Sequence, residues 1–207
     1  MLGCSGFTLP STDPAPKGPV APGKRFDVRE RRDLFPSAGS GFPTPEAGLD
    51  AEQCSALTAG GPPIGPDCMS GELKCGETII GHTTGGVRRF DTRFYESNFC
   101  TPATTDHDGG DERVYRLKVP DGDWTAVVTL DSPCADLDLA AMKHNDDRCP
   151  TSATMVGQCE MYPKEGKTRE QVRLVSQRES WWWIVVEGNG AAEGGFALSV
   201  QCRAGVR

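Results

Sequence analysis

The sequence predicts an all-β fold, a two-sheet antiparallel sandwich of the jelly-roll type with about eight strands and an extended N-terminal tether. Three observations predict it. Apolar residues alternate with polar ones in short segments separated by Gly, Pro, Asp and Asn, no helical period of comparable length occurs, and prolines gather near the N-terminus. A chain of 207 residues is expected to form one domain with a tail.

Residues 1–66 are expected to form the tether. Eleven of the 16 prolines fall within residues 5–66, and every Trp and Tyr lies beyond residue 90. A segment of this composition buries too little apolar surface to offset its ordering entropy, so we expect it to be mostly without regular structure. The folded domain is then expected to span residues 67–207.

The clearest strand is expected at residues 124–131. Trp124, Ala126, Val128 and Leu130 share one face of it, because side chains alternate between the two faces of a strand. The other strands are expected at residues 73–80, 87–95, 115–119, 137–141, 172–176, 181–187 and 196–202. Turn signals such as Pro120-Asp121-Gly122 separate them, and eight strands at this spacing favour a sandwich.

The nine cysteines include no CxxC pair, which excludes zinc fingers and thioredoxin-like sites and favours disulfides formed in an oxidising compartment. Eight of them are candidates for four bridges: Cys54, Cys68, Cys75, Cys100, Cys134, Cys149, Cys159 and Cys202. Although 105 pairings exist, short loops close most readily. Sequence neighbours are therefore expected to pair, as Cys54–Cys68, Cys75–Cys100 and Cys149–Cys159, leaving Cys134–Cys202.

The ninth cysteine has a separate explanation. Met1-Leu2-Gly3-Cys4-Ser5 resembles the end of a bacterial lipobox, in which the cysteine is lipidated. The charged and apolar regions of a signal peptide are missing upstream, so either the sequence was trimmed or its start codon was assigned too far downstream. The other interpretation is an incidental Cys4 in the tail. We expect lipidation at Cys4, attachment to the membrane through that lipid, and display on the bacterial cell envelope or extracellular surface.

Several stretches in order resemble the bacterial pre-peptidase C-terminal domain and its relatives in secreted proteins and lipoproteins. Together they cover residues 73–202, and they are Cys75-Gly76-Glu77-Thr78 with Gly81-His82-Thr83-Thr84, residues 111–120, Asp136-Leu137-Asp138-Leu139, residues 182–188 and Gly195-Phe196-Ala197-Leu198-Ser199-Val200. The resemblance implies a non-catalytic β-sandwich that is appended to exported hydrolases, aids secretion or binds substrate, and sometimes binds calcium. This sequence has no room for a peptidase, so the domain is expected to be a whole mature protein or a subunit.

Acidic residues are concentrated between residues 106 and 147, where eleven acids face four basic residues. This balance of −7 equals the net charge of the chain, so one acidic face or edge is expected. Because calcium prefers several carboxylate oxygens, it is a possible cofactor, with a solvated acidic edge as the other interpretation. The candidate ligands are Asp106, Asp108, Asp111, Glu112, Asp136 and Asp138.

The three consecutive tryptophans are the strongest aromatic feature. In a strand Trp181 and Trp183 share one face, where they could stack on sugar rings or anchor a protein; the other interpretation is packing within the sheet. No GxSxG or HExxH motif accompanies the three histidines, so no catalytic residue is assigned and no enzyme is expected.

The combined prediction is a non-catalytic, lipid-anchored binding or assembly module of the cell envelope, with an envelope protein complex or a polysaccharide as its partner. A pI near 5.0 argues against nucleic acid, and no apolar run reaches the ~18 residues that cross a bilayer. Two alternatives remain open. One is a calcium-dependent carbohydrate- or protein-binding domain, and the other is an unrecognised hydrolase.

Overall fold

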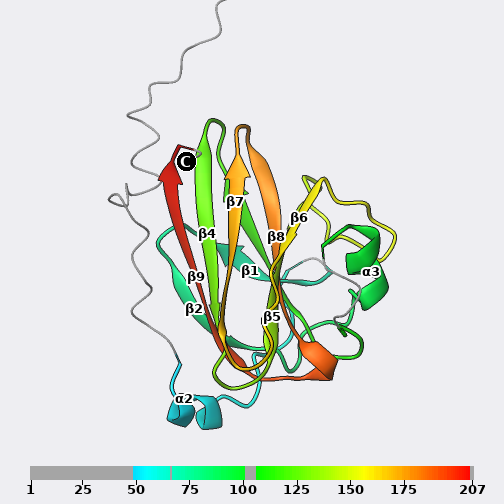
Figure 1. Ribbon diagram of the computed structural model, residues 1–207, viewed down its shortest axis with the longest axis vertical. Coiled ribbons are helices and arrows are strands. Elements are labelled where there is room, and N and C mark those ends of the chain that lie inside the picture. The colour runs from blue at the N-terminus through cyan, green and yellow to red at the C-terminus, as the bar shows by residue number, and fades with distance from the viewer. Residues whose placement is uncertain (1–48, 66, 101–105, 206–207) are drawn as a thin grey trace, which may run out of the picture.

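A computed structural model describes residues 49–65, 67–100 and 106–205, and it forms a sandwich of two sheets (Figure 1). Cys4 and residues 1–48 lie outside this part, so lipidation and the bulk of the tether stay predictions. The elements are α2 (Ala51–Ala56), β1 (Met69–Leu73), β2 (Thr78–His82), α3 (Thr92–Ser97), β3 (Arg113–Val119), β4 (Trp124–Asp131), β5 (Leu137–Lys143), β6 (Gln158–Met161), β7 (Arg169–Ser176), β8 (Ser180–Gly188), the 3-10 turn η1 (Asn189–Ala191) and β9 (Gly195–Ala204).

The nine strands form a five-stranded sheet, β1-β3-β8-β5-β6, and a four-stranded sheet, β2-β9-β4-β7. Neighbouring strands are antiparallel except β1 and β3, which run parallel. The predicted all-β sandwich is therefore confirmed. Its core lies between the sheets, where the alternate residues Trp124, Ala126, Val128 and Leu130 of β4 are all buried, as their spacing predicts.

A second apolar cluster covers the outer face of the five-stranded sheet. Phe90, Phe94 and Tyr95, from α3 and the segment before it, pack there against Trp183 and Val185 of β8. Strand β8 is thus buried on both faces, because Trp182, Ile184 and Val186 point into the inner core. This double burial explains why residues 182–186 form an unbroken apolar run.

Two strand predictions are wrong. Residues 73–80 do not form one strand, because they are divided between β1 and β2, which belong to different sheets. In the turn that joins these strands, the Glu77 carboxylate accepts a hydrogen bond from the Lys74 N–H. Residues 87–95 contain only an isolated bridge from Val87 to Glu112 and then helix α3. The Asp91 side chain caps this helix by accepting a 2.7 Å hydrogen bond from the Phe94 N–H.

The predicted tether includes residues 49–65, but these residues lie against the sandwich. Helix α2 begins at a capping box formed by Asp50 and Gln53, and Cys54 is bonded to Cys134. Leu57 packs against Gly195, where a Cβ atom would come 3.0 Å from the Leu57 side chain. The folded unit therefore begins upstream of residue 67.

All eight predicted cysteines form disulfides, but all four predicted pairings are wrong. The bridges are Cys54–Cys134, Cys68–Cys149, Cys75–Cys202 and Cys100–Cys159, with sequence separations of 59 to 127 residues. Loop-closure entropy grows only slowly with loop length, so it is a weak guide to pairing. The strand order decides instead: pairing of β2 with β9, for example, brings Cys75 beside Cys202.

Candidate functional site

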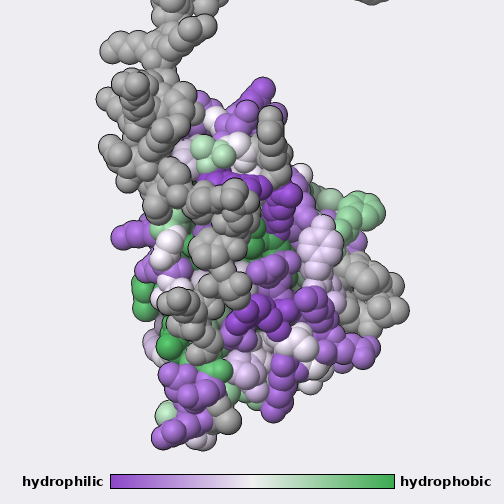
Figure 2. Space-filling view, turned by 60° about the vertical axis from the view of Figure 1, so that its left-hand side comes forward, coloured by the Kyte–Doolittle hydropathy of each residue, from purple (hydrophilic) through white to green (hydrophobic). Residues whose placement is uncertain are grey.

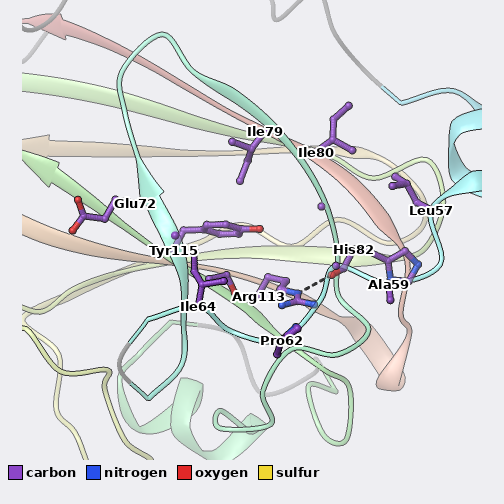
Figure 3. Close-up of a pocket in the computed structure, with 14 residues that line it drawn as sticks. Leu57, Ala59, Pro62, Ile64, Glu72, Ile79, Ile80, His82, Arg113 and Tyr115 are labelled. Atoms are coloured by element: carbon purple, nitrogen blue, oxygen red, sulfur yellow. Dashed lines mark hydrogen bonds between the residues drawn. The ribbon is translucent and has the colours of Figure 1, made fainter.

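A pocket of about 440 Å³ opens where the two sheets meet, between the edge strands β1 and β2. Figure 3 shows Ile79, Tyr115 and Arg113 around it, with Pro62 and Ile64 contributed by the segment after α2. Figure 2 shows a face of the molecule on which hydrophilic side chains predominate and hydrophobic ones are scattered among them. The sequence motifs did not indicate this pocket, because its residues come from distant segments.

Arg113 is the charged group at the base of this pocket and is only 1% exposed. Its Nε donates to the His82 carbonyl and its Nη2 to the Thr84 carbonyl, both at 2.8 Å. Among the described residues no carboxylate lies within ion-pair distance of Arg113; Asp111 attracts it through its charge at longer range and is itself paired with Arg88 at 2.7 Å. Burial lowers the pKa of Arg113. The pocket therefore contains a buried cation whose hydrogen bonds within the described residues go to backbone carbonyls, while the charge of Asp111 acts on it from beyond ion-pair distance.

Tyr115 contributes a second polar group from the neighbouring inward-facing position of β3. Burial raises the pKa of its phenol to about 12, so the hydroxyl stays protonated at neutral pH and can donate a hydrogen bond. Gly81 leaves room for this ring, because a Cβ there would lie 3.1 Å from the Tyr115 oxygen and 2.6 Å from the Phe196 ring. Within the described segments, no residue accepts a hydrogen bond from the Tyr115 hydroxyl.

His82 is unsuited to act as a base in this pocket. Its Nδ1 accepts a 3.1 Å hydrogen bond from the Thr84 N–H, so the neutral ring carries its proton on Nε2. Burial lowers its pKa and favours this neutral form. Ser70 also lines the pocket, but its buried hydroxyl has no hydrogen-bond partner in the described part of the chain. Nucleophilic hydrolysis needs a base bonded to its nucleophile, so this pocket gives the hydrolase alternative no support.

The candidate calcium ligands do not converge on one point. Asp106 accepts from the Asp108 N–H, and Asp108 accepts in turn from the Thr92 N–H. Asp111 is paired with Arg88, whereas Asp136 and Asp138 lie at the start of β5. No three His, Cys, Asp or Glu side chains in the described segments are grouped to hold a metal ion. Calcium binding by these residues stays a prediction.

Three buried acids instead form a row across neighbouring strands, which we call the carboxylate row: Glu112, Glu187 and Asp138. Asp138 lies opposite Glu187 in the β5–β8 register. On the other side of β8, Arg113 lies opposite Val186, so the preceding residue, Glu112, is next to Glu187. Burial raises the pKa of Glu112 to about 8 and of Asp138 to about 7, and it raises that of Glu187 well above its ordinary value. Glu187 was missed because it ends an apolar run.

His107 contacts the carboxylate row. Its Nδ1 lies 2.8 Å from Glu187 Oε1 and 3.7 Å from Asp138 Oδ2, although neither contact has hydrogen-bond geometry. Burial lowers the pKa of His107, which favours the neutral ring. Tyr95 packs edge-on against this ring at 5.1 Å between centroids. The row and its histidine are thus enclosed beneath α3, and neither Asp138 oxygen accepts a hydrogen bond from an N–H group in the described part of the chain, although the Glu170 carboxyl group is paired with it.

The prediction of a single acidic face or edge is wrong. Glu112 and Asp138 are buried, and they do not contribute to the surface. The acids of the 106–111 segment precede β3, whereas Asp121 and Asp123 follow it, so the two groups lie at opposite ends of a seven-residue strand. A strand of this length separates them by roughly 20 Å.

The two tryptophans predicted to bind a ligand have different environments. Trp183 is fully buried and donates through Nε1 to the His144 carbonyl at 3.1 Å, so the prediction is wrong for this residue. Trp181 is half-buried, and the Arg116 guanidinium lies 4.0 Å from its ring centroid. It borders a groove of about 450 Å³ together with Leu73 and Pro120. Ligand binding by Trp181 stays a prediction.

Among the described helices, none has the length and apolar character that a membrane crossing requires. No known protein-family model matches the sequence, and no curated protein matches it.

The fold can be compared with solved structures. The pre-peptidase C-terminal domain of a collagenase from Bacillus anthracis aligns with 64% of this chain and 96% of its own, at 12% identity and a TM-score of 0.39. A periplasmic inhibitor of g-type lysozyme from Aeromonas hydrophila aligns with 63% of this chain and 94% of its own, at 8% identity and a TM-score of 0.30. These values concern the fold and say nothing of function. The first match is to the kind of domain that the sequence motifs resemble.

Proposed function

We propose that this protein is a non-catalytic binding module of the bacterial cell envelope, attached to the membrane through a lipid on Cys4. The observation that supports binding most directly is the pocket between β1 and β2, in which Arg113 is buried without a carboxylate within ion-pair distance among the described residues. A buried cation without a direct ion pair is costly, and a ligand that supplied a negative charge in contact with it would offset that cost.

The disulfides support the compartment. Four bridges connect all eight cysteines of the described part, and bridges of this kind persist in oxidising compartments. Cys4 is the remaining cysteine, and it stands in the lipobox-like sequence. This arrangement favours an anchor at Cys4 and a partner among envelope proteins or polysaccharides.

The test is purification of the protein from the bacterium that encodes it, followed by mass spectrometry of the intact chain before and after reduction. We expect a lipid on Cys4, a mass gain of two hydrogens for each reduced bridge, and a co-purifying partner. A Cys4→Ser variant should move from the membrane fraction to the soluble fraction. An unmodified Cys4 in membrane-free protein would refute the anchor, and protein that emerges without any partner would count against the binding role.

A calcium-dependent binder is the second candidate, supported by the buried carboxyl group of Asp138 beside His107 and the acidic 106–111 segment. Calcium would supply a positive charge beside the buried Asp138 carboxylate. We expect calcium to raise the melting temperature, EDTA to reverse that rise, and Asp138→Asn to abolish it. A melting temperature insensitive to both reagents would eliminate this candidate.

A further inference from the structure

We propose that the pocket between β1 and β2 binds the C-terminal carboxylate of an extended peptide whose last side chain is apolar. This inference rests on the proposed binding function and names the chemical class of its ligand.

Two hydrogen-bond donors in the pocket favour a carboxylate. Arg113 uses Nε and Nη2 on backbone carbonyls, and within the described segments no residue accepts a hydrogen bond from its Nη1. The Tyr115 hydroxyl is the second donor, and both side chains extend toward the same space in Figure 3. A carboxylate can accept from both groups at once, and it neutralises the guanidinium.

The charge around the pocket favours a single negative charge on the ligand. Glu72 is the one acidic residue of the lining, and its carboxylate is paired with Arg116 at 2.5 Å. The lining thus offers one unpaired cation, Arg113, whereas a phosphate carries up to two negative charges and usually collects several donors or cations. A carboxylate fits this arrangement better than a phosphate does.

The walls favour an apolar group next to that carboxylate. Leu57, Pro62 and Ile64 approach from the segment after α2, and Ile79 approaches from β2. Ile64 is 78% exposed, so a ligand side chain that covers it would remove apolar surface from water. The volume of about 440 Å³ lies within the range of small-ligand pockets.

The edge position favours a peptide over other carboxylates. Among the described strands β2 is the last of its sheet and pairs only with β9, and its residues 79–82 line the pocket. The main-chain N–H and C=O groups on the outer side of an edge strand can pair with an extended peptide, which is a common mode of peptide recognition. A C-terminal residue bound in this way would present its carboxylate to Arg113.

The experiment uses the oxidised full chain and two pooled libraries of random pentapeptides, one with free C-terminal carboxylates and one with C-terminal amides. We expect enrichment of carboxylate peptides that end in Leu, Ile, Val, Phe or Met. Amidation of an enriched peptide should weaken its affinity about 10- to 100-fold, as loss of a charged hydrogen bond does. Equal binding of acid and amide forms would overturn the proposal. Binding of octanoate without binding of any peptide would also overturn it, because the ligand would then be a simple fatty acid.

Variants locate the binding site without requiring removal of the buried Arg113. Tyr115→Phe keeps the ring and removes one donor, so the affinity of an enriched peptide should fall about 2- to 10-fold. Ile64→Asp places a negative charge at the pocket and should abolish binding. Met155→Asp is the matched control, because Met155 is 68% exposed and lies outside the pocket; it should leave affinity unchanged. If neither library is enriched while the native protein co-purifies with a partner, the peptide inference fails and the binding function stands.

Discussion

The substitution Asp138→Asn removes one buried charge with almost no change of volume. Asp138 is 1% exposed, and neither of its oxygens accepts a hydrogen bond from an N–H group of the described residues; its carboxyl group is instead paired with that of Glu170. Burial, followed by the charge of Glu170, raises its pKa from 3.8 to about 7. A difference of roughly three pKa units corresponds to about 4 kcal/mol between the ionised and protonated forms. The ionised carboxylate therefore destabilises the fold by that order of magnitude.

The sign of the effect follows from proton binding. Below pH 3.8 the carboxyl group is protonated in both states and contributes no difference. Between pH 3.8 and about 7 the folded protein keeps this proton while the unfolded chain loses it, so the free energy of unfolding falls as pH rises. The asparagine variant lacks this term. We expect it to match the native protein near pH 3.5 and to exceed its stability by up to about 4 kcal/mol at pH 9.

The measurement is urea unfolding of both proteins in EDTA across this pH range. Asp123→Asn is the control, because Asp123 is exposed in a turn and its substitution should change the unfolding free energy by no more than about 0.5 kcal/mol. The free energy of unfolding of the native protein should also fall as pH rises. Because the pKa of Glu112 is about 8, this fall should continue to more alkaline pH than Asp138 alone would produce. A variant that is less stable at pH 9, or a difference that does not vary with pH, would refute the reasoning.

Three further predictions concern stability. Replacing Cys75 and Cys202 together by Ser should cost about 4 to 5 kcal/mol in chemical unfolding, because their bridge closes a loop with a sequence separation of 127 residues; an unchanged midpoint would be inconsistent with that bridge. Leu139→Ala empties a buried position of the inner core and should lower the unfolding free energy by about 2 to 5 kcal/mol, against a negligible change for the exposed Val175→Ala. Gly188→Ala would place a Cβ 1.7 Å from the Ala192 carbonyl oxygen, so we expect the free energy of unfolding to fall by roughly 2 kcal/mol or more, measured by thermal melting. Native-like stability would show that η1 can shift to make room.

The strands that sequence reasoning could predict are those with one polar and one apolar face. Strand β4 shows this alternation because its outward residues include Thr125 and Asp131, and β9 shows it with Phe196 and Leu198. The sequence wrongly predicts a strand over residues 87–95, because a six-residue helix such as α3 is too short to display a helical period. The Asp91 cap was the available local signal for that helix.

The site residues were harder to predict because their environment depends on which strands become neighbours. Glu112 and Asp138 resemble solvated acids in the sequence, yet the β3-β8-β5 order places them beside Glu187 under a helix. The strand period could have suggested Glu187, which shares a face with Trp183 and Val185. Nothing local indicates that Arg113 faces a pocket, because its two acceptors belong to the segment around His82, about thirty positions away.

The overlapping disulfides also determine how the protein transmits mechanical force. With the bridges intact, the shortest covalent route from Cys54 to Cys202 runs to Cys75 and across to its partner, about 20 residues instead of about 150. Full extension of that route spans only about 70 Å, against about 500 Å for the reduced chain. A domain pulled between Cys54 and its last strand would therefore act as a short, nearly inextensible link, and reduction would convert it into a long one.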